Sequence, residues 1–348
     1  MERLKASLEA GHGILLAPNH CRTSDPLVLG RMMRKIGANT FCMASWHLFK
    51  QDWFTTFMIR RLGAFSVYRE GMDRAAINTA VDILQHARRP LVVFPEGAIS
   101  RHNDQLMGLM DGVALMARTA AKKRAKATPG GRVIVHPVAI RYFFRGDLER
   151  SLSPVLTEIE NHFSWKSQEH QPLLTRIRQV GEALLTLKEI EAFGHAHEGD
   201  LYERVEALID QLLCPLEEEW AIKERSGSAV VRVKNLRTAI LPDMIDGDLT
   251  EDERARRWRQ LTDCYYAQQM LHYTRDYISR ENNVPERILE TVERFEEDLT
   301  DEMRAHGPLH VVIQVGRAIE VSPQRDRTAT TDRSCRRSKT NCGPCWPS

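Results

Sequence analysis

The sequence predicts an α/β protein, a largely parallel sheet flanked by helices, with a large all-helical insertion. Within the first 145 residues, short runs rich in Val, Ile and Phe alternate with segments of helical periodicity. This alternation favours a parallel sheet that helices cover on both faces. Long amphipathic helical patterns then extend to residue 308, and a strand-like composition returns at 309–323.

The strands predicted in the first part are brief, apolar and bounded by Gly or Pro, which is typical of buried strands. Helical patterns separate them, among them PLVLGRMMRKIG, DRAAINTAVDILQHARR and GLMDGVALMARTAAKKRAK. The strands are expected at 13–19, 63–68, 90–97 and 132–144.

The helical block is predicted from the spacing of its apolar residues. DLYERVEALIDQLL and VPERILETVERFEEDL each place their aliphatic side chains on one helical face. Thr250 and Glu253, three residues apart, form a capping box that opens a helix. We therefore expect an α/β domain at 1–145, a helical insertion or subdomain at 146–308, a returning strand of the α/β domain at 309–323, and a disordered tail at 324–348.

Charge is distributed unevenly along the 348 residues, although the net charge is only +2. Residues 1–150 hold 23 Lys and Arg against 12 Asp and Glu, whereas residues 151–324 hold 20 against 33. A basic amino-terminal part attracts anions such as phosphorylated cofactors, phospholipid head groups or an acidic partner. No signature of a nucleic-acid-binding fold accompanies it, so we expect no nucleic acid as partner.

Neither a membrane-spanning segment nor a signal peptide is predicted. No run approaches the roughly 18–20 apolar residues of a membrane span, and residues 1–13 lack an apolar core. The seven cysteines are scattered without a disulfide framework, which favours a reducing compartment. We expect a cytoplasmic protein that reaches a membrane, if at all, peripherally from its cytoplasmic face.

The tail contains CGPC at 342–345, which resembles a redox motif but lacks the strand and helix that normally surround one. With Cys335 the tail offers three thiols, fewer than a structural zinc site uses. We therefore predict neither a metal site nor a resident cofactor.

The stretch LLAPNHCRTSDP, residues 15–26, holds the first candidate catalytic pair, His20 and Asp25. The spacing H-x4-D is weak evidence alone, because it recurs at His47/Asp52 and His195/Asp200. Only the first pair directly follows a buried strand. In open α/β sheets ligands bind at the carboxyl ends of strands, so this context selects His20 and Asp25.

Asp25 has a second interpretation, because Asp followed by Pro commonly opens a helix. In that case Asp25 is an N-cap and His20 an ordinary loop residue. Both roles are compatible, since one carboxylate oxygen can cap the helix while the other accepts the imidazole N–H.

The later predicted strands also end in polar residues or glycine. We expect these strand ends to lie at the same edge of the sheet as His20 and Asp25. Taken in order, they resemble the four motif blocks of the glycerolipid acyltransferase family, whose best-known members are the 1-acylglycerol-3-phosphate acyltransferases. The resemblance spans residues 13–142 and implies a glycerol-phosphate acyltransferase-like fold. The matching residues are Asn19, His20, Asp25 and Pro26; Gly63 and Arg69; Phe94, Pro95, Glu96 and Gly97; and Pro137 with Val138.

The resemblance implies a chemistry that these residue types suit. A histidine general base activates a hydroxyl of a lysolipid or glycerol acceptor, which attacks the thioester of acyl-CoA or acyl carrier protein. Imidazole, with an unperturbed pKa of about 6.5, is mostly neutral at pH 7 and accepts a proton well. His20 is then the base and Asp25 its orienting partner. The implied substrate-binding residues are Asn19, Arg69, Glu96, Gly97 and Arg101.

Two departures from the family pattern remove positive charge. Block three reads FPEGAIS, with Ala98 and Ile99 where the family has Thr and Arg, although Arg101 follows two positions on. Asp111 lies near a place where the family often has lysine. The alternative is therefore a non-catalytic lipid-binding or scaffold protein that retains the fold, and a third interpretation is thioester hydrolysis.

The aromatic and basic stretch at 41–63 has two interpretations, a bilayer-interface segment or ordinary core packing. The basic segment at 118–132 suits the end of a helix and also attracts a membrane, CoA phosphates or acyl carrier protein. We expect a lipid surface and the acyl donor as partners, and the sequence predicts no particular oligomeric state.

Overall fold

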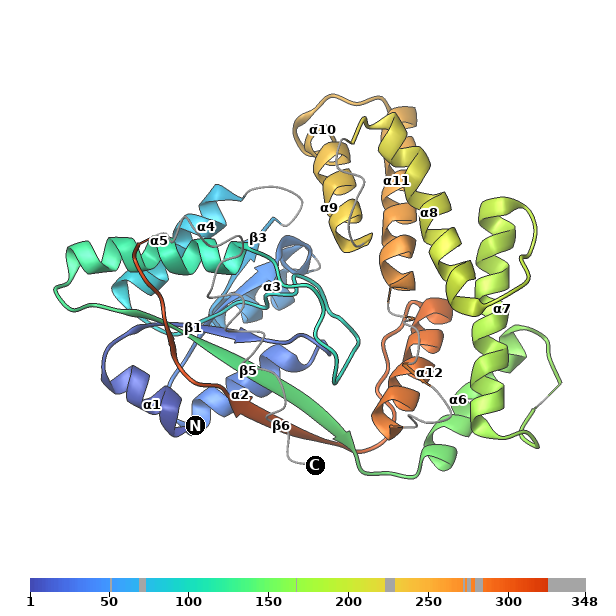
Figure 1. Cartoon of the computed structure of the whole chain (residues 1–348), viewed down its shortest axis with the longest axis horizontal. Coiled ribbons are helices and arrows are strands. Elements are labelled where there is room, and N and C mark those ends of the chain that lie inside the picture. Colours follow the sequence, from blue (N-terminus) through green and yellow to red (C-terminus); the bar gives the residue numbers. More distant parts are fainter. Residues whose placement is uncertain are drawn as a thin grey trace. The chain divides into compact units, whose positions relative to one another are not determined.

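The computed structural model divides into two compact units, one of Met1–Tyr142 with Val311–Ser348 and one of Phe143–His310 (Figure 1). Each unit has its own hydrophobic core. The residues that the structure describes are 1–50, 52–68, 73–166, 168–222, 229–271, 273, 277–278 and 284–324. Of the predicted tail, residues 325–348 lie outside this set.

The first unit is built on a sheet of strand order β3-β2-β4-β1-β5-β6, with β7 paired to β5. The pairs β1–β4, β1–β5, β2–β3 and β2–β4 are parallel, and β5–β7 is antiparallel. The predicted fold class, a largely parallel α/β sheet, is therefore confirmed. The strands are β1 (Gly13–Pro18), β2 (Phe41–Ser45), β3 (Ala64–Val67), β4 (Leu91–Val92), β5 (Val133–Phe144), β6 (Leu309–Val315) and β7 (Ile319–Glu320).

Strand β1 is central, and all six of its residues are buried. Helices α4 (Arg74–His86) and α5 (Gly112–Ala127) pack on one face of the sheet, where they share a core with Leu15 and Val135. Helices α1 (Glu2–Glu9) and α2 (Asp25–Lys35) lie on the opposite side in Figure 1. A side chain at Gly13 would meet the Leu84 carbonyl oxygen at 2.1 Å, so only glycine permits this close packing.

The sequence-based strand limits differ from the observed ones in three places. Strand β4 ends at Val92, and the residues from Pro95 onward form a turn. The predicted strand at 309–323 is split into β6 and β7. The stretch 41–63 contains a strand that was not predicted, β2, followed by the short 3-10 helix η1 (Trp46–Phe49) and by α3 (Trp53–Arg61).

The second unit consists of packed helices. One core joins α6, α7 and α12 to Phe144, and a second core joins α8, α9 and α11. Arg176 forms an ion pair with Glu160 at 2.8 Å, with both side chains almost fully buried. The Thr250 hydroxyl accepts a hydrogen bond from the Glu253 amide at the start of α11, which is one half of the predicted capping box, whereas the Glu253 carboxylate accepts from Arg256 and Arg257. The helices are α6 (Leu148–His162), α7 (Leu173–Phe193), α8 (Leu201–Glu219), α9 (Ala229–Ile240), α10 (Pro242–Asp246), α11 (Glu251–Met270) and α12 (Pro285–Thr300).

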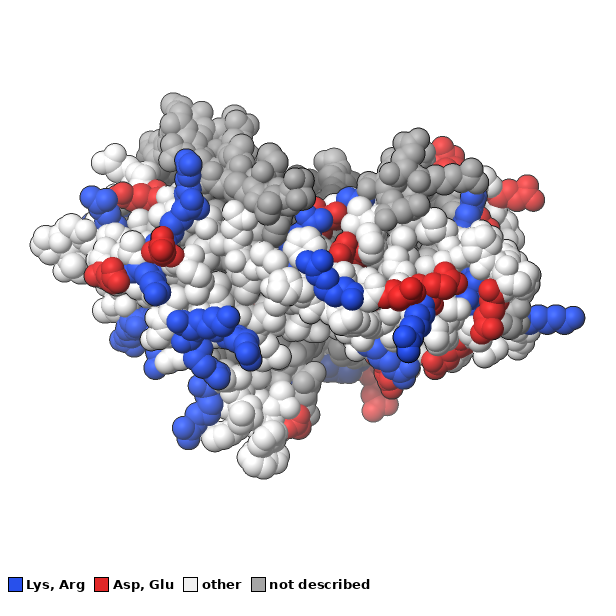
Figure 2. Space-filling model, turned by 90° about the horizontal axis from the view of Figure 1, so that it is seen from below, with Lys and Arg blue, Asp and Glu red and all other residues white. Residues whose placement is uncertain are grey.

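The surfaces of the two units carry different charge patterns. Lys and Arg side chains gather over the first unit on the face drawn in Figure 2. Over the helical unit acidic and basic side chains are interspersed on this face. The helical unit also contains exposed i,i+4 ion pairs such as Arg178–Glu182 at 3.0 Å. In the described part of the chain, no helix has the length and apolar character needed to cross a bilayer.

Candidate active site

The loop that follows β1 is fastened to the neighbouring strand β5. The Asn19 side-chain amide donates to the Ile140 carbonyl at 3.0 Å and accepts from the Ile140 amide at 2.7 Å. Asn19 thereby extends the β1–β5 ladder, whose last backbone pair is Pro18 with Val138. The loop residues that come next are held at the carboxyl end of the central strand.

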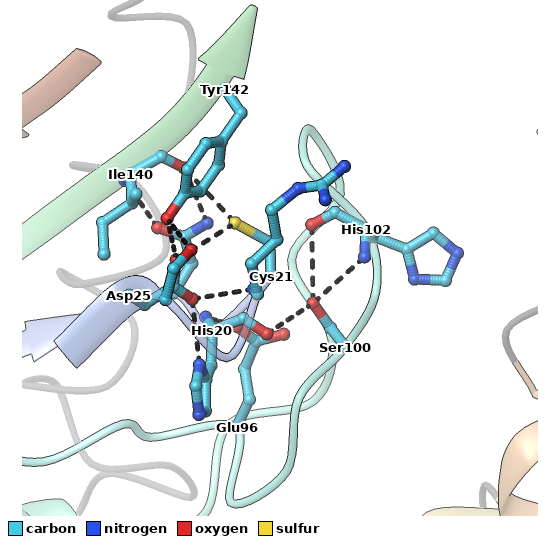
Figure 3. Close-up of polar contacts among 11 residues, drawn as sticks. His20, Cys21, Asp25, Glu96, Ser100, His102, Ile140 and Tyr142 are labelled. Carbon is cyan, nitrogen blue, oxygen red and sulfur yellow. Dashed lines mark hydrogen bonds and ion pairs between the residues drawn. The ribbon is translucent and has the colours of Figure 1, made fainter. Parts of the chain in front are cut away.

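His20 and Asp25 are in direct contact (Figure 3). The His20 Nδ1 lies 2.9 Å from the Asp25 Oδ2. The imidazole is 16% exposed, and its ring stacks on Phe94 with 3.9 Å between centroids. Because a carboxylate accepts hydrogen bonds, the bond assigns the ring proton to Nδ1 and leaves the Nε2 lone pair as acceptor. Within the described part of the chain, nothing is hydrogen-bonded to Nε2.

Asp25 is fully buried, and its carboxylate accepts hydrogen bonds from several directions. The Arg22 amide donates to Oδ2 at 2.9 Å, and the Tyr142 hydroxyl donates to Oδ1 at 2.8 Å. The interpretation of Asp25 as an N-cap is wrong, because Ser24 holds the N-cap position and α2 begins at Asp25 itself. Asp25 therefore turns its carboxylate toward His20 and Tyr142.

Tyr142 is the main site residue that was not predicted from the sequence. Its hydroxyl also lies 2.9 Å from the Ser24 Oγ, and burial together with the nearby Asp25 charge raises the pKa of the phenol well above its usual value. The phenol therefore stays protonated and donates to Asp25. The sequence did contain a signal for Tyr142, because residues 138, 140 and 142 of β5 share one face of the strand. Tyr142 therefore lies on the same face as Val138 of the fourth motif block.

The loop after β4 holds the His20 backbone on both sides. The Glu96 Oε1 accepts from the His20 amide at 2.7 Å, and the Ser100 amide donates to the His20 carbonyl at 2.7 Å. The Ser100 hydroxyl donates to the same carbonyl at 3.0 Å. The other Glu96 oxygen accepts from the Met107 amide at 3.0 Å. This arrangement fixes the imidazole by its backbone as well as by its ring.

Glu96 is buried, and desolvation raises the pKa of its carboxyl to about 7, against the stabilising effect of the two amide donors. The carboxylate of Asp25 adds to this rise. A carboxyl group with this pKa changes charge near neutral pH, and this one accepts a hydrogen bond from the His20 amide.

The comparison with known families agrees with this geometry. The model of the acyltransferase family matches residues 2–141. These residues belong to the acyltransferase family. They carry strands β1 to β4, most of β5, and His20, Asp25 and Glu96, and they end one residue before Tyr142. The predicted family resemblance is confirmed. No curated protein matches the chain.

Within the acyltransferase domain, Gly97 and Arg101 lie in the loop that also carries Glu96. Gly97 has a φ of +73°, and a side chain there would meet the Met110 sulfur at 2.2 Å, so the turn requires glycine. Arg101 is half-buried and has a left-handed φ of +57°. Arg69 lies outside the described residues. Substrate binding by Asn19, Arg69, Glu96, Gly97 and Arg101 therefore stays a prediction.

Among the described residues, no group of three or more His, Cys, Asp or Glu side chains is placed to hold a metal ion. The acyltransferase domain thus presents a histidine and a buried carboxylate, with polar backbone groups around them. That set suits proton transfer from a hydroxyl.

Proposed function

We propose that the acyltransferase domain moves a fatty acyl group from acyl-CoA or acyl carrier protein to a hydroxyl of a glycerolipid or lysophospholipid acceptor. The observation that carries the proposal is the His20 imidazole. Its Nδ1 is bound to the buried Asp25 carboxylate, and its Nε2 is left as a proton acceptor. The domain's membership of the acyltransferase family supports the reaction class.

In the proposed reaction, Nε2 of His20 takes the proton of the acceptor hydroxyl while the oxygen attacks the thioester carbonyl carbon. The new C–O bond forms as the carbonyl π electrons move to oxygen. When the tetrahedral intermediate collapses, the C–S bond breaks and the thiolate takes the proton from Nε2. The products are an ester and a free thiol, and His20 returns to its starting state.

Asp25 holds the imidazole in the required tautomer and stabilises the imidazolium that forms during attack. In this proposal Asn19 and Glu96 position the His20 loop. The Asn19 side chain binds the backbone of Ile140, and the Glu96 carboxylate accepts from the amides of His20 and Met107. Bringing donor and acceptor together on this rigid loop supplies much of the rate by proximity.

We place this activity in the cytoplasm, peripherally on the cytoplasmic face of a membrane, as part of phospholipid synthesis. The cysteines that the structure describes, Cys21, Cys42, Cys214 and Cys264, form no disulfide bonds, which suits a reducing compartment.

The test is to incubate the purified protein with a radiolabelled acyl-CoA or acyl carrier protein and a panel of lysophospholipids and glycerol phosphates. We expect label to appear in a diacyl or monoacyl product with at least one acceptor. Label released as free fatty acid at the same rate without acceptor would show thioester hydrolysis instead. No transfer to any acceptor, with lipid binding retained, would favour the non-catalytic scaffold.

A further inference from the structure

Helix α3 turns its large apolar side chains outward. Trp53 is 79% exposed, Phe54 58% and Phe57 46%, and none of the nine residues of α3 is buried. Soluble proteins rarely leave neighbouring aromatic side chains uncovered in this way. The surface formed by Trp53, Phe54, Phe57 and Met58 is called the α3 face below.

The orientation of α3 is the reverse of that expected for a helix on a soluble protein. With about 100° per residue, positions 53, 54, 57 and 58 share one side of the helix. The half-buried positions on the other side are Thr55, Thr56 and Ile59. Two of the three inward residues carry hydroxyl groups, whereas the outward side is aromatic. This pattern is typical of a helix that lies in a membrane interface.

Basic side chains border the α3 face. Arg61 stacks on Phe57 with 5.0 Å from the guanidinium to the ring centroid, and Arg60 lies 5.8 Å from the ring of Phe49. A hollow of about 630 Å³ beside the helix is lined by Lys50, Arg60 and Arg61 together with these aromatic rings. Three cationic side chains and one carboxylate line the hollow, so its net positive charge suits a phosphate-bearing group.

The carboxylate in the hollow belongs to Asp52, and it is committed to the helix. Its Oδ1 accepts from the Thr55 amide at 2.8 Å. Hydrogen bonding from the Thr55 side chain, and then from the Thr55 amide, lowers the pKa of the Asp52 carboxyl. Asp52 thus serves as the N-cap of α3, where it also suits the helix dipole. The remaining charges of the hollow are positive.

We propose that the α3 face docks the acyltransferase domain on the surface of an anionic phospholipid bilayer. The aromatic side chains enter the boundary between head groups and acyl chains, while Lys50, Arg60 and Arg61 contact lipid phosphates. The inference rests on the proposed function in one respect: membrane binding would serve to bring the domain to its lipid acceptor. The binding itself is independent of the chemistry at His20.

The experiment is co-sedimentation of the full chain with vesicles of phosphatidylcholine alone or mixed with phosphatidylglycerol. We expect the wild-type protein to prefer the mixed vesicles. Trp53→Ser with Phe57→Ser should weaken binding by about tenfold or more, because apolar area no longer enters the interface. Arg60→Gln with Arg61→Gln should weaken it by about fivefold per charge and abolish the preference for the anionic lipid.

The matched control is Trp258→Ser with Arg259→Gln on α11, where Trp258 is 55% exposed and Arg259 is exposed. This variant should bind vesicles like the wild type. Equal binding by the α3 variants, or no sedimentation of the wild type, would overturn the proposal. So would a wild-type dimer in light scattering that Trp53→Ser with Phe57→Ser makes monomeric, because a second copy would then cover the α3 face.

Two further measurements separate this inference from the proposed function. His20→Ala should lose acyl transfer and keep vesicle binding. The α3 variants should transfer acyl groups to a water-soluble short-chain acceptor at the wild-type rate, since Arg60 and Arg61 contact Phe49 and Phe57, whereas the His20 ring contacts Asp25 and Phe94. A catalytic failure and a docking failure therefore give different results.

Discussion

The pairs His20/Asp25 and His47/Asp52 have the same H-x4-D spacing, but their two aspartates make different contacts. In the second loop, Asp52 is the N-cap of α3 and its carboxylate accepts from the Thr55 amide. His47 stacks on the neighbouring Trp46 at 3.9 Å. In the first loop, Ser24 holds the N-cap position, and the Asp25 carboxylate binds the His20 ring.

The difference shows that the position of the aspartate relative to its helix decides its role. The carboxylate oxygens of an N-cap aspartate accept hydrogen bonds from the amides of the first helical turn. A third pair follows the same rule, because Asp200 accepts from the Tyr202 and Glu203 amides at the start of α8. A shift of one residue, together with the buried donors around it, frees Asp25 for His20.

The largest expected effect comes from His20→Ala. Loss of the general base should lower acyl transfer by about 10²–10⁴-fold. His47→Ala is the matched control and should leave transfer unchanged. The measurement is the initial rate with the acceptor identified in the panel, and circular dichroism checks that both variants are folded. Equal activity of the two variants would mean that the loops do not differ in function.

The second effect is expected from Asp25→Asn. The amide keeps the size of the side chain but no longer fixes the tautomer of His20, so kcat should fall by about 10²-fold. Asp52→Ala should lower the melting temperature slightly through loss of the α3 cap, without changing kcat. A kcat loss in Asp52→Ala comparable to that in Asp25→Asn would contradict the distinction between the two carboxylates.

The third prediction concerns Glu96, which supports only the first loop. Because burial raises its pKa to about 7, the folded protein holds this proton more tightly than the unfolded chain does. The stabilisation is complete below the unfolded pKa and is lost as pH rises through about 7. At about 1.4 kcal/mol per pKa unit, the change is on the order of 3 kcal/mol.

Denaturant titrations at pH 5 and pH 8 measure this change. Glu96→Gln cannot titrate, so its free energy of unfolding should depend less on pH over this range than that of the wild type. The exposed Glu9→Gln should keep the wild-type dependence. If wild type and Glu96→Gln lose equal stability between the two pH values, Glu96 is already ionised in the folded protein at pH 5.

The sequence predicted the sheet well where strands were short, apolar and ended by Gly or Pro. It missed β2, because Phe41–Ser45 is mostly half-buried and runs into an aromatic segment that continues as helices. The candidate pair His20 and Asp25 was found because both follow a buried strand within seven residues of its end. His47 and Asp52 follow the half-buried strand β2 at the same two offsets, so strand context separated the two pairs only because β2 had not been predicted.

The surroundings of the pair were not predictable in the same way. Tyr142 lies 117 residues from Asp25, and the two meet only because β5 pairs with β1. Glu96 reaches the His20 amide because β4 lies on the other side of β1. Strand order is set by the packing of the whole sheet, and a single sequence carries no direct record of it.

The smallest expected effect is that of Tyr142→Phe, which removes the hydroxyl that donates to Asp25 and keeps the ring. Loss of one hydrogen bond to a buried carboxylate should lower kcat by about tenfold and leave KM unchanged, because the phenol acts on the base and not on the substrate. Ser24→Ala removes the other partner of the phenol but leaves its bond to Asp25, so it should cost less. A rise in KM without loss of kcat in Tyr142→Phe would instead place the hydroxyl against the acceptor. Full activity in that variant would show that the His20–Asp25 contact alone orients the base, and that the two H-x4-D loops differ only in where their helices begin.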